Sequence, residues 1–255
     1  MSRTLTLGYG VLVYVLFLGT FVYFIGFAAG FEFMPNSVNS GRAAPTAQAM
    51  AINLGMLGLF AAQHFIMARP WFKRRWTRII PVTIERSTYV LATTLIVLLM
   101  LWQWQPMPGL MWHIENPIGM YCLWGLWGVG WIVMLYSTFL VDHFDLFGLR
   151  QVYLSWRGVP YTDVQFKMRS LYRYVRHPMM VGFIIAFWAT PKMSSGHLLF
   201  AIAATGMILI GIQLEERDLL AAHGASYEEF RRRVPMLIPR LSGAAPITAS
   251  AEAKS

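Results

Sequence analysis

Two polar groups stand at the ends of one hydrophobic stretch in the last third of the chain. Arg176, His177 and Pro178 come just before the stretch, and Glu215 and Glu216 come just after it. Because proline is well tolerated in the first helical turn, this order predicts a helix N-terminus, whose free backbone N–H groups favour an anion such as a carboxylate. A basic helix flank in contact with lipid headgroups would carry the same residue types. The pattern therefore fits either a ligand site or an ordinary membrane flank.

The two glutamates are the less ordinary half of this pattern. We expect Glu215 and Glu216 to end the apolar helix, where the helix dipole disfavours acids. A cation should therefore compensate for them, and the candidates in the chain are Arg173, Arg176 and Arg217. A cationic ligand is another candidate, and a surface cluster of salt bridges is the simpler alternative.

A second set of candidates lies at the ends of two earlier apolar runs. Asp142, His143 and Asp145 are close together in the sequence, and His64 stands near the end of the second run. A histidine titrates near neutral pH, and a carboxylate can also act as a general base. The candidates for removing a proton from a substrate are therefore His143, Asp145 and His64. A structural role is the alternative for each of them. The spacing is too sparse for a metal site, and we expect none.

Aromatic and sulfur-bearing side chains give weaker signals. Tyr172 and Tyr174 fit an aromatic pocket for a purine or a sulfonium, but they fit an interfacial aromatic belt equally well. The single cysteine, Cys122, lies inside an apolar run, where we expect a small buried side chain. One cysteine allows no disulfide within the chain and no Cys/His zinc spacing.

Apolar runs must carry these residues. Four long runs are followed by two shorter ones, which a turn of Pro, Gly and Ser separates; the expected runs are 7–31, 47–68, 87–104, 118–141, 179–190 and 197–214. About 20 apolar residues in a helix cross the hydrocarbon layer of a membrane. We predict an all-α integral membrane protein with about five or six transmembrane helices, the last two forming a helical hairpin.

The basic residues are divided unevenly between the loops. The strongly basic segments are 69–78, 150–176 and 231–233, whereas the alternate loops hold only Arg42 and Lys192 between them. Six crossings with both termini inside would place every basic segment on the cytoplasmic face. We therefore predict a membrane protein whose polar residues converge at that face. Five crossings would break this consistency unless the last hairpin does not fully span.

The composition agrees with a membrane protein. Of 255 residues, 56% are hydrophobic and 13% are charged, against roughly 25% charged residues in a soluble domain. We predict one membrane domain over 1–240, with four helices in 1–141, a functional region in 142–240 and a disordered tail in 241–255. The net charge is +9. Because the Lys and Arg residues flank apolar runs, we expect the lipid bilayer as a partner and no nucleic acid.

The C-terminal third carries a longer pattern that occurs in order and at suitable spacing. Its members are Arg176-His177-Pro178, Met180, Gly182, Glu215-Glu216, Leu219, Gly224, Tyr227 and Pro235. This pattern resembles the isoprenylcysteine carboxyl methyltransferase-like membrane methyltransferases. In that family the arginine–histidine–proline turn and the acid pair form a cradle for S-adenosylmethionine. The resemblance implies a cytoplasmic cofactor pocket that the C-terminal tail closes.

The resemblance also implies a role for each matching residue. Cofactor contacts would come from Tyr172, Arg176, His177, Pro178, Met180 and Glu215. Glu216 would contact the cofactor or hold the arginines. Compatible chemistry exists for both ends of the ligand, because Arg176 and a helix N-terminus suit the methionine carboxylate and a glutamate suits the amine or a ribose hydroxyl.

Further segments extend the resemblance to most of the chain. They are Gln63-His64, Met67-Ala68-Arg69-Pro70, Glu85-Arg86-Ser87-Thr88-Tyr89, and His143 through Gln151. They are similar to bacterial membrane enzymes that methylate methanethiol to dimethyl sulfide. This similarity implies a small volatile thiol as substrate and a location in the bacterial inner membrane, with the site facing the cytoplasm. Prenylcysteine enzymes usually carry a tyrosine where Met180 stands and an arginine near Gly211. The missing arginine argues against a prenylcysteine substrate and fits a small neutral thiol.

Other functions remain open at this point. A methyltransferase for a lipid-like or prenylated thiol or carboxyl would need a lateral groove and a cation near Gly211. An NADPH-dependent membrane reductase would need extra basic residues for the 2′-phosphate. A transporter or sensor would need polar residues at mid-membrane depth, where this chain is nearly free of charge. The sequence assigns no oligomeric state.

Overall fold

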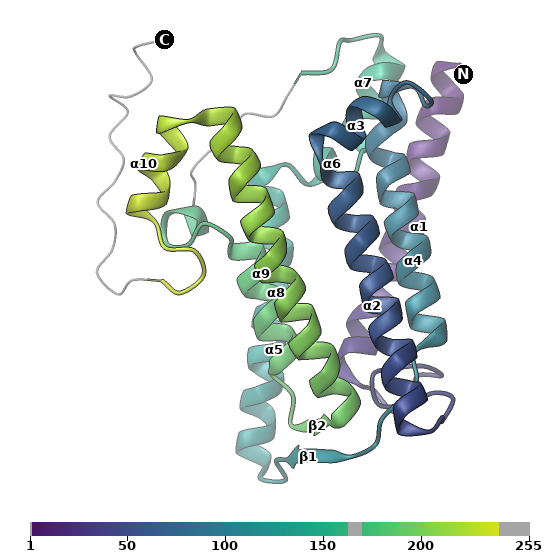
Figure 1. Cartoon of the computed structure of the whole chain (residues 1–255), viewed down its shortest axis with the longest axis vertical. Coiled ribbons are helices and arrows are strands. Elements are labelled where there is room, and N and C mark those ends of the chain that lie inside the picture. Colours follow the sequence, from purple (N-terminus) through teal and green to yellow (C-terminus); the bar gives the residue numbers. More distant parts are fainter. Residues whose placement is uncertain (1, 163–169, 240–255) are drawn as a thin grey trace.

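The fold is a bundle of long apolar helices (Figure 1). The computed structural model describes residues 2–162 and 170–239. Within this range five helices are long and apolar enough to cross a membrane: α1 (Arg3–Ala29), α2 (Thr46–Ala68), α4 (Glu85–Gln103), α5 (Pro117–Val141) and α9 (Ser195–His223). The predicted all-α integral membrane architecture is confirmed. The tail predicted to be disordered, 241–255, lies outside the described residues.

A sixth pass through the bundle is made by a shorter helix. α8 (Pro178–Trp188) has 11 residues, and at 1.5 Å per residue a helix of that length covers only about half of the ~30 Å hydrocarbon layer. The chain then reaches the far end of the bundle in strand β2 (Lys192–Ser194), which pairs antiparallel with β1 (Leu110–His113). α8 and α9 therefore form the predicted hairpin, with arms of unequal length.

Short helices gather at the other end of the bundle, which we call the polar end (Figure 1). They are α3 (Pro70–Trp76), α6 (His143–Leu146), α7 (Leu149–Arg157) and α10 (Ala225–Arg233). Two 3-10 turns, η1 (Val82–Ile84) and η2 (Ser170–Arg173), precede α4 and α8 in the chain. α1 begins at the polar end and α9 returns to it, so the first and last described helices meet the same face of the bundle.

Two glycines allow α5 and α8 to pack closely. A Cβ atom on Gly130 would lie 2.8 Å from the carbonyl oxygen of Gly182, and one on Gly182 would lie 2.6 Å from that of Gly130. In lipid the hydrophobic effect contributes little to helix association, so van der Waals contacts between closely packed backbones at small residues stabilise the pair. The two helices therefore form a rigid pair that carries the start of α8.

An aromatic core joins the helices near the sheet. Its buried rings are Phe27, Trp104, Trp131, Phe187 and Phe200, which come from α1, the residue after α4, α5, α8 and α9. Phe27 and Trp104 meet edge to face with centroids 5.6 Å apart, a favourable geometry for aromatic pairs. This core ties both halves of the chain together at the end of the bundle opposite the polar side chains.

Two local predictions were wrong. The last apolar run was expected to end as a helix before Glu215, but α9 continues to His223 and ends at Gly224, which has φ +53°. The intervening Leu, Glu, Arg and Ala residues are strong helix formers, so the helix outlasts the apolar stretch. Cys122, expected to be buried, is exposed on α5. On the outside of a membrane bundle lipid is as apolar as the protein interior, so this side chain need not be covered by protein.

Candidate active site

An ion-pair cluster joins the start of α8 to α9. Arg176 Nε donates to Glu216 Oε1 at 2.7 Å, and His177 Nε2 lies 3.0 Å from the same oxygen. The side chains of Arg176 and Glu216 are 9% and 10% exposed. A carboxylate this deeply buried requires a partner, and Arg176 is the compensating cation among those expected. Pro178 is buried in the first turn of α8, and Met180 is partly buried beside it.

The residues that follow α10 pack over the turn that precedes α8. The backbone N–H groups of Arg176 and His177 donate to the carbonyls of Pro235 at 2.9 Å and Met236 at 3.2 Å. Arg176 Nη1 also donates to the carbonyl of Val234 at 2.6 Å. The backbone donors at this turn, which the sequence suggested for a ligand carboxylate, are therefore bonded to the chain's own carbonyls.

Glu215 is the open member of the acid pair. Its side chain is 51% exposed, and its Oε2 lies 3.8 Å from Nδ1 of His177. Glu215 is therefore available to an amine or a hydroxyl of a ligand. Tyr172 is buried and Tyr174 is exposed, so the aromatic-pocket interpretation suits Tyr172 alone of the two. Burial raises the pKa of the Tyr172 phenol, which remains neutral at physiological pH.

Arg69 links the end of α2 to the acid-bearing part of α9. Its Nη1 donates to the carbonyl of Leu214 at 3.0 Å and to Oδ2 of Asp218 at 2.7 Å. One turn earlier on α9, a Cβ atom on Gly211 would lie 3.2 Å from a ring carbon of Phe65. A long side chain at position 211, such as the arginine of prenylcysteine enzymes, would therefore have to displace this ring.

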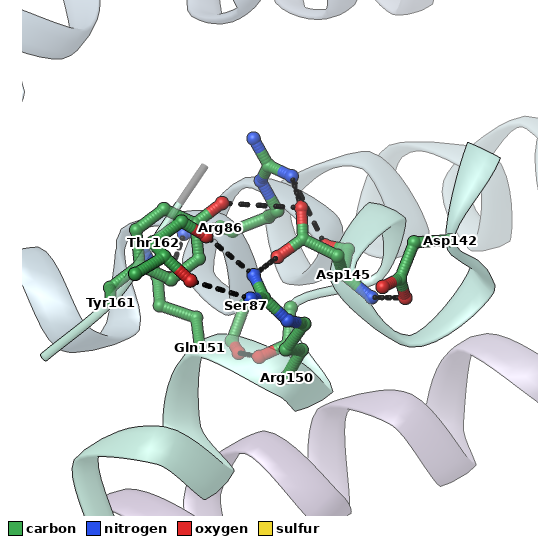
Figure 2. Close-up of polar contacts among 9 residues, drawn as sticks. Arg86, Ser87, Asp142, Asp145, Arg150, Gln151, Tyr161 and Thr162 are labelled. Carbon is green, nitrogen blue, oxygen red and sulfur yellow. Dashed lines mark hydrogen bonds and ion pairs between the residues drawn. The ribbon is translucent and has the colours of Figure 1, made fainter. Parts of the chain in front are cut away.

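Asp145 lies at the centre of a second ionic cluster (Figure 2). Arg86 and Tyr161 donate to its Oδ2 and Arg150 donates to its Oδ1, the last at 3.2 Å. The backbone N–H of Asp145 donates to Asp142 Oδ1 at 3.0 Å. Two arginines and a phenol satisfy this carboxylate, whose side chain is 7% exposed. The cluster therefore fixes α4, α6 and α7 relative to one another.

His143 occupies a separate environment, although it is close to Asp145 in the sequence. Its Nε2 lies 2.7 Å from the hydroxyl of Tyr14, and its Nδ1 lies 2.8 Å from Oγ1 of Thr138. The ring stacks on Phe139 with centroids 4.4 Å apart. Burial lowers the pKa of the imidazole, so His143 is neutral at physiological pH. The acid–histidine group expected from the sequence is thus divided between two faces of α6.

His64 pairs with a tyrosine of the neighbouring helix. Its Nδ1 lies 2.8 Å from the hydroxyl of Tyr89 on α4, and its ring stacks on Phe60 with centroids 5.3 Å apart. The ring is therefore held on both sides. Its hydrogen bond fixes the position of the Tyr89 hydroxyl.

A cavity of about 150 Å³ opens beside Tyr89 and Arg86. The residues that line it are Ala68, Lys73, Glu85, Arg86, Tyr89 and Leu146. Of the three candidate proton acceptors from the sequence, two lie behind this lining. His64 bonds to Tyr89, and Asp145 bonds to Arg86. His64 and Asp145, which the sequence grouped only by their predicted membrane face, therefore each contact a residue that lines the same cavity.

Comparison with known proteins decides the family. A methanethiol S-methyltransferase of Mycobacterium tuberculosis is 55% identical over 239 residues, which cover 94% of this chain and 98% of that protein. The chain belongs to the methanethiol S-methyltransferase family. A methanethiol S-methyltransferase of Crocosphaera subtropica is 50% identical over 94% of this chain and 93% of its own length. Nurim of Xenopus laevis is a more distant relative, 26% identical over 66% of this chain and 62% of its own. No protein-family model and no solved structure matches the chain.

Membership in the methanethiol S-methyltransferase family confirms the resemblance drawn from the sequence and makes the chain an enzyme that requires a methyl donor. Sequence reasoning assigned no role to Lys73 or Glu85, which line the cavity, although Glu85 belongs to a segment that carries the resemblance. Lys73 is one of several cations in a basic segment, and nothing in its spacing distinguishes it. Glu85 offered a signal, because it is an acid placed directly before an apolar run at the basic end of the bundle.

Proposed function

We propose that this protein transfers the methyl group of S-adenosylmethionine to methanethiol and forms dimethyl sulfide. The observation that carries the proposal is the 55% identity, along nearly the whole of both chains, to a protein named methanethiol S-methyltransferase. The geometry of the polar end agrees with it. A half-exposed carboxylate beside a buried ion pair suits a ligand that carries an amine, a carboxylate and hydroxyl groups.

The proposed donor site is the start of α8 and the facing part of α9. Contacts with the donor are assigned to Tyr172, Arg176, His177, Pro178, Met180 and Glu215. Within the described residues the Nη2 group of Arg176 makes no hydrogen bond, so it is available to the methionine carboxylate. Glu216 orients Arg176 and His177, because both donate toward its Oε1. When bound, S-adenosylmethionine supplies an electrophilic methyl group on a sulfonium.

The acceptor is proposed to be a small neutral thiol. The uncharged Gly211 and the adjacent Phe65 ring offer no partner for a substrate carboxylate. An apolar volatile product can leave into the surrounding lipid. The polar end is proposed to face the cytoplasm of a bacterial inner membrane, because it carries the basic segments. The residues after α10 would close the donor pocket there.

Proton removal from the thiol is proposed to take place at the polar end, where His143, Asp145 and His64 were the candidates. Their contacts favour positioning roles. Asp145 holds Arg86, and His64 holds Tyr89, so each orients a residue of the cavity lining. His143 connects α6 to Tyr14 of α1, and both of its ring nitrogens have partners.

Headspace gas chromatography tests this function. Purified protein in detergent receives S-adenosylmethionine and methanethiol, and dimethyl sulfide is measured. We expect product from wild type and none from an Arg176→Ala, Glu215→Ala double variant. The matched control is an Arg42→Ala, Glu115→Ala double variant, which removes one exposed cation and one exposed acid at the other end of the bundle.

Each other outcome would reject a different part of the proposal. Tight S-adenosylmethionine binding without dimethyl sulfide would reject methanethiol and point to a larger, lipid-like acceptor. NADPH oxidation by folded protein that does not bind S-adenosylmethionine would reject methyl transfer in favour of a reductase. Equal loss of product in both double variants would remove the donor assignment from α8 and α9.

A further inference from the structure

We propose that the cavity at the polar end is the thiol-binding site, in which Glu85 takes the proton of the thiol and Lys73 holds the thiolate. This inference rests on the proposed function and adds the acceptor side of the same site. The cavity has walls of two kinds. Ala68 and Leu146 are apolar, whereas Lys73, Glu85, Arg86 and Tyr89 bring polar groups.

The size of the cavity suits a very small acceptor. Its volume of about 150 Å³ gives room for several water-sized molecules. Methanethiol, with two non-hydrogen atoms, fits such a space. The apolar wall of Ala68 and Leu146 suits the methyl group, and the charged wall suits the sulfur. The cavity therefore has both the room and the lining for a small thiol.

Glu85 is a buried acid that makes no direct polar contact. It is 8% exposed, and within residues 2–162 and 170–239 its carboxylate makes no hydrogen bond and no ion pair. Its oxygens are not fully enclosed, so they are open to the cavity that Glu85 lines. Asp145, on the same side of the bundle, is satisfied by three donors. The contrast indicates that Glu85 is kept for a ligand that enters the cavity.

Lys73 brings a positive charge to the same cavity, and this charge interacts with that of Glu85. It lies on α3 and is half-buried, and its ammonium makes no ion pair in the described part of the chain. Burial lowers its pKa, and the charge of Glu85 opposes that effect. A cation beside a thiol favours the thiolate, which is the reactive form. Arg86, fixed by Asp145, adds a second positive charge to the lining.

The cavity adjoins the proposed donor site. Ala68 is followed directly by Arg69, which bonds to the carbonyl of Leu214 and the carboxylate of Asp218. These two residues flank Glu215 on α9. Arg69, the residue that follows α2, therefore joins the cavity wall to the helix that carries the open carboxylate of the proposed donor site.

The proton and the electrons balance in the proposed step. The proton of the S–H group passes to the carboxylate of Glu85. The thiolate sulfur forms a bond to the methyl carbon as the bond from that carbon to the sulfonium breaks, and the electron pair of the broken bond remains on the donor's sulfur. Glu85 then releases its proton to water. A positioned general base contributes roughly 10²- to 10⁴-fold to rate.

Two measurements test the assignment. Carbon-13 NMR of labelled methanethiol, added to purified full-length protein without a donor, reports the protonation state of the bound thiol. We expect it to ionise at lower pH than the free thiol in wild type, and to lose that shift in Lys73→Met. Near neutral pH, Glu85→Gln should lower kcat/KM about 100-fold or more. The kcat/KM of Glu85→Gln should rise about tenfold per pH unit, because the variant depends on thiolate formed in solution, whose fraction rises about tenfold per unit below the thiol pKa.

Matched controls are available on the same elements. Arg74→Met removes the exposed cation next to Lys73, and Glu115→Gln removes an exposed acid at the other end of the bundle. Both should keep wild-type kinetics and NMR titration. The inference is overturned if Lys73→Met and Glu85→Gln behave like these controls, or if Glu85→Gln loses the same fraction of activity at every pH.

Failure of this inference is distinguishable from failure of the proposed function. Calorimetric binding of S-adenosylmethionine and dimethyl sulfide formation by wild type establish the function without reference to the cavity. If both succeed while the two variants remain active, the cavity assignment alone is wrong. If wild type forms no dimethyl sulfide, the proposed function is wrong, and the NMR titration still decides whether the cavity binds a thiol.

Discussion

Glu216 is the residue on which the proposed donor cluster converges. Glu216→Gln removes the charge that Arg176 and His177 share. Hydrogen bonds to charged groups contribute about 1.5–3 kcal/mol. We therefore expect S-adenosylmethionine affinity to fall at least tenfold and the melting temperature to fall by a few degrees, measured by titration calorimetry and thermal unfolding. Glu229→Gln is the control, because Glu229 pairs with arginines of its own helix at the surface. Unchanged affinity in Glu216→Gln would contradict the clustering role.

His143 makes the stability of the fold depend on pH. Burial lowers its pKa in the folded state, so the unfolded chain binds the proton more readily below about pH 6.5. The stability from neutral His143 is complete above that pH and is lost as pH falls toward the lowered pKa. Melting temperatures at pH 7.5 and 5.5 should therefore diverge less in His143→Gln than in wild type. An equal divergence in both proteins would show that His143 does not contribute.

The sequence predicted some of these residues and could not predict others. Glu216 and Arg176 were visible because an acid beside an apolar run requires a cation. Lys73 and Glu85 were not, because their common cavity depends on how α3 and α4 fold together across a turn. The separation of His143 from Asp145 has the same origin. Sequence neighbours on a short helix such as α6 point in different directions, and tertiary packing decides which partners each one meets.

At the scale of elements, close packing of α5 and α8 sets the position of the proposed donor site. In Gly182→Ala the new methyl group would lie 2.5 Å from the backbone nitrogen of Met134. Backbone cannot move as a side chain can, so we expect about 1–3 kcal/mol of destabilisation and a lower melting temperature in detergent. Gly125→Ala on α5 has no atom within 4 Å of the added carbon and should be neutral or slightly stabilising. Equal melting temperatures for both variants would refute the tight contact.

Apolar runs predicted the long helices well and the short elements poorly. A run of apolar residues indicates which part of the chain lies in the hydrocarbon layer. The end of a helix depends instead on helix propensity and on backbone conformation. α9 therefore continues beyond the apolar run and ends before Gly224. Strands β1 and β2 were read as loops. Each is at most 4 residues long, and each exists because the other lies beside it. Such pairing leaves no periodic signal in either segment.

The path of the chain through the whole bundle makes six passes. α8 covers only part of its pass, and the segment after it, which includes β2, reaches the far end of the bundle. The number of passes is therefore even, and the described parts of the basic segments fall together at the polar end. This arrangement follows the positive-inside rule, since Arg42 and Lys192 are the only Lys or Arg residues in the described loops at the other end.

Cysteine labelling in membrane vesicles tests this topology. In a Cys122→Ser background, Arg74→Cys marks the polar end and Glu115→Cys marks the sheet end, and both positions are exposed. A membrane-impermeant maleimide should label Arg74→Cys in inside-out vesicles alone and Glu115→Cys in right-side-out vesicles alone, because basic segments favour the cytoplasmic side and we propose that the polar end lies there. Labelling of both positions from the same side would mean that α4, which lies between them in the chain, does not cross the membrane. The reverse pattern would place the proposed site outside the cytoplasm, away from its methyl donor.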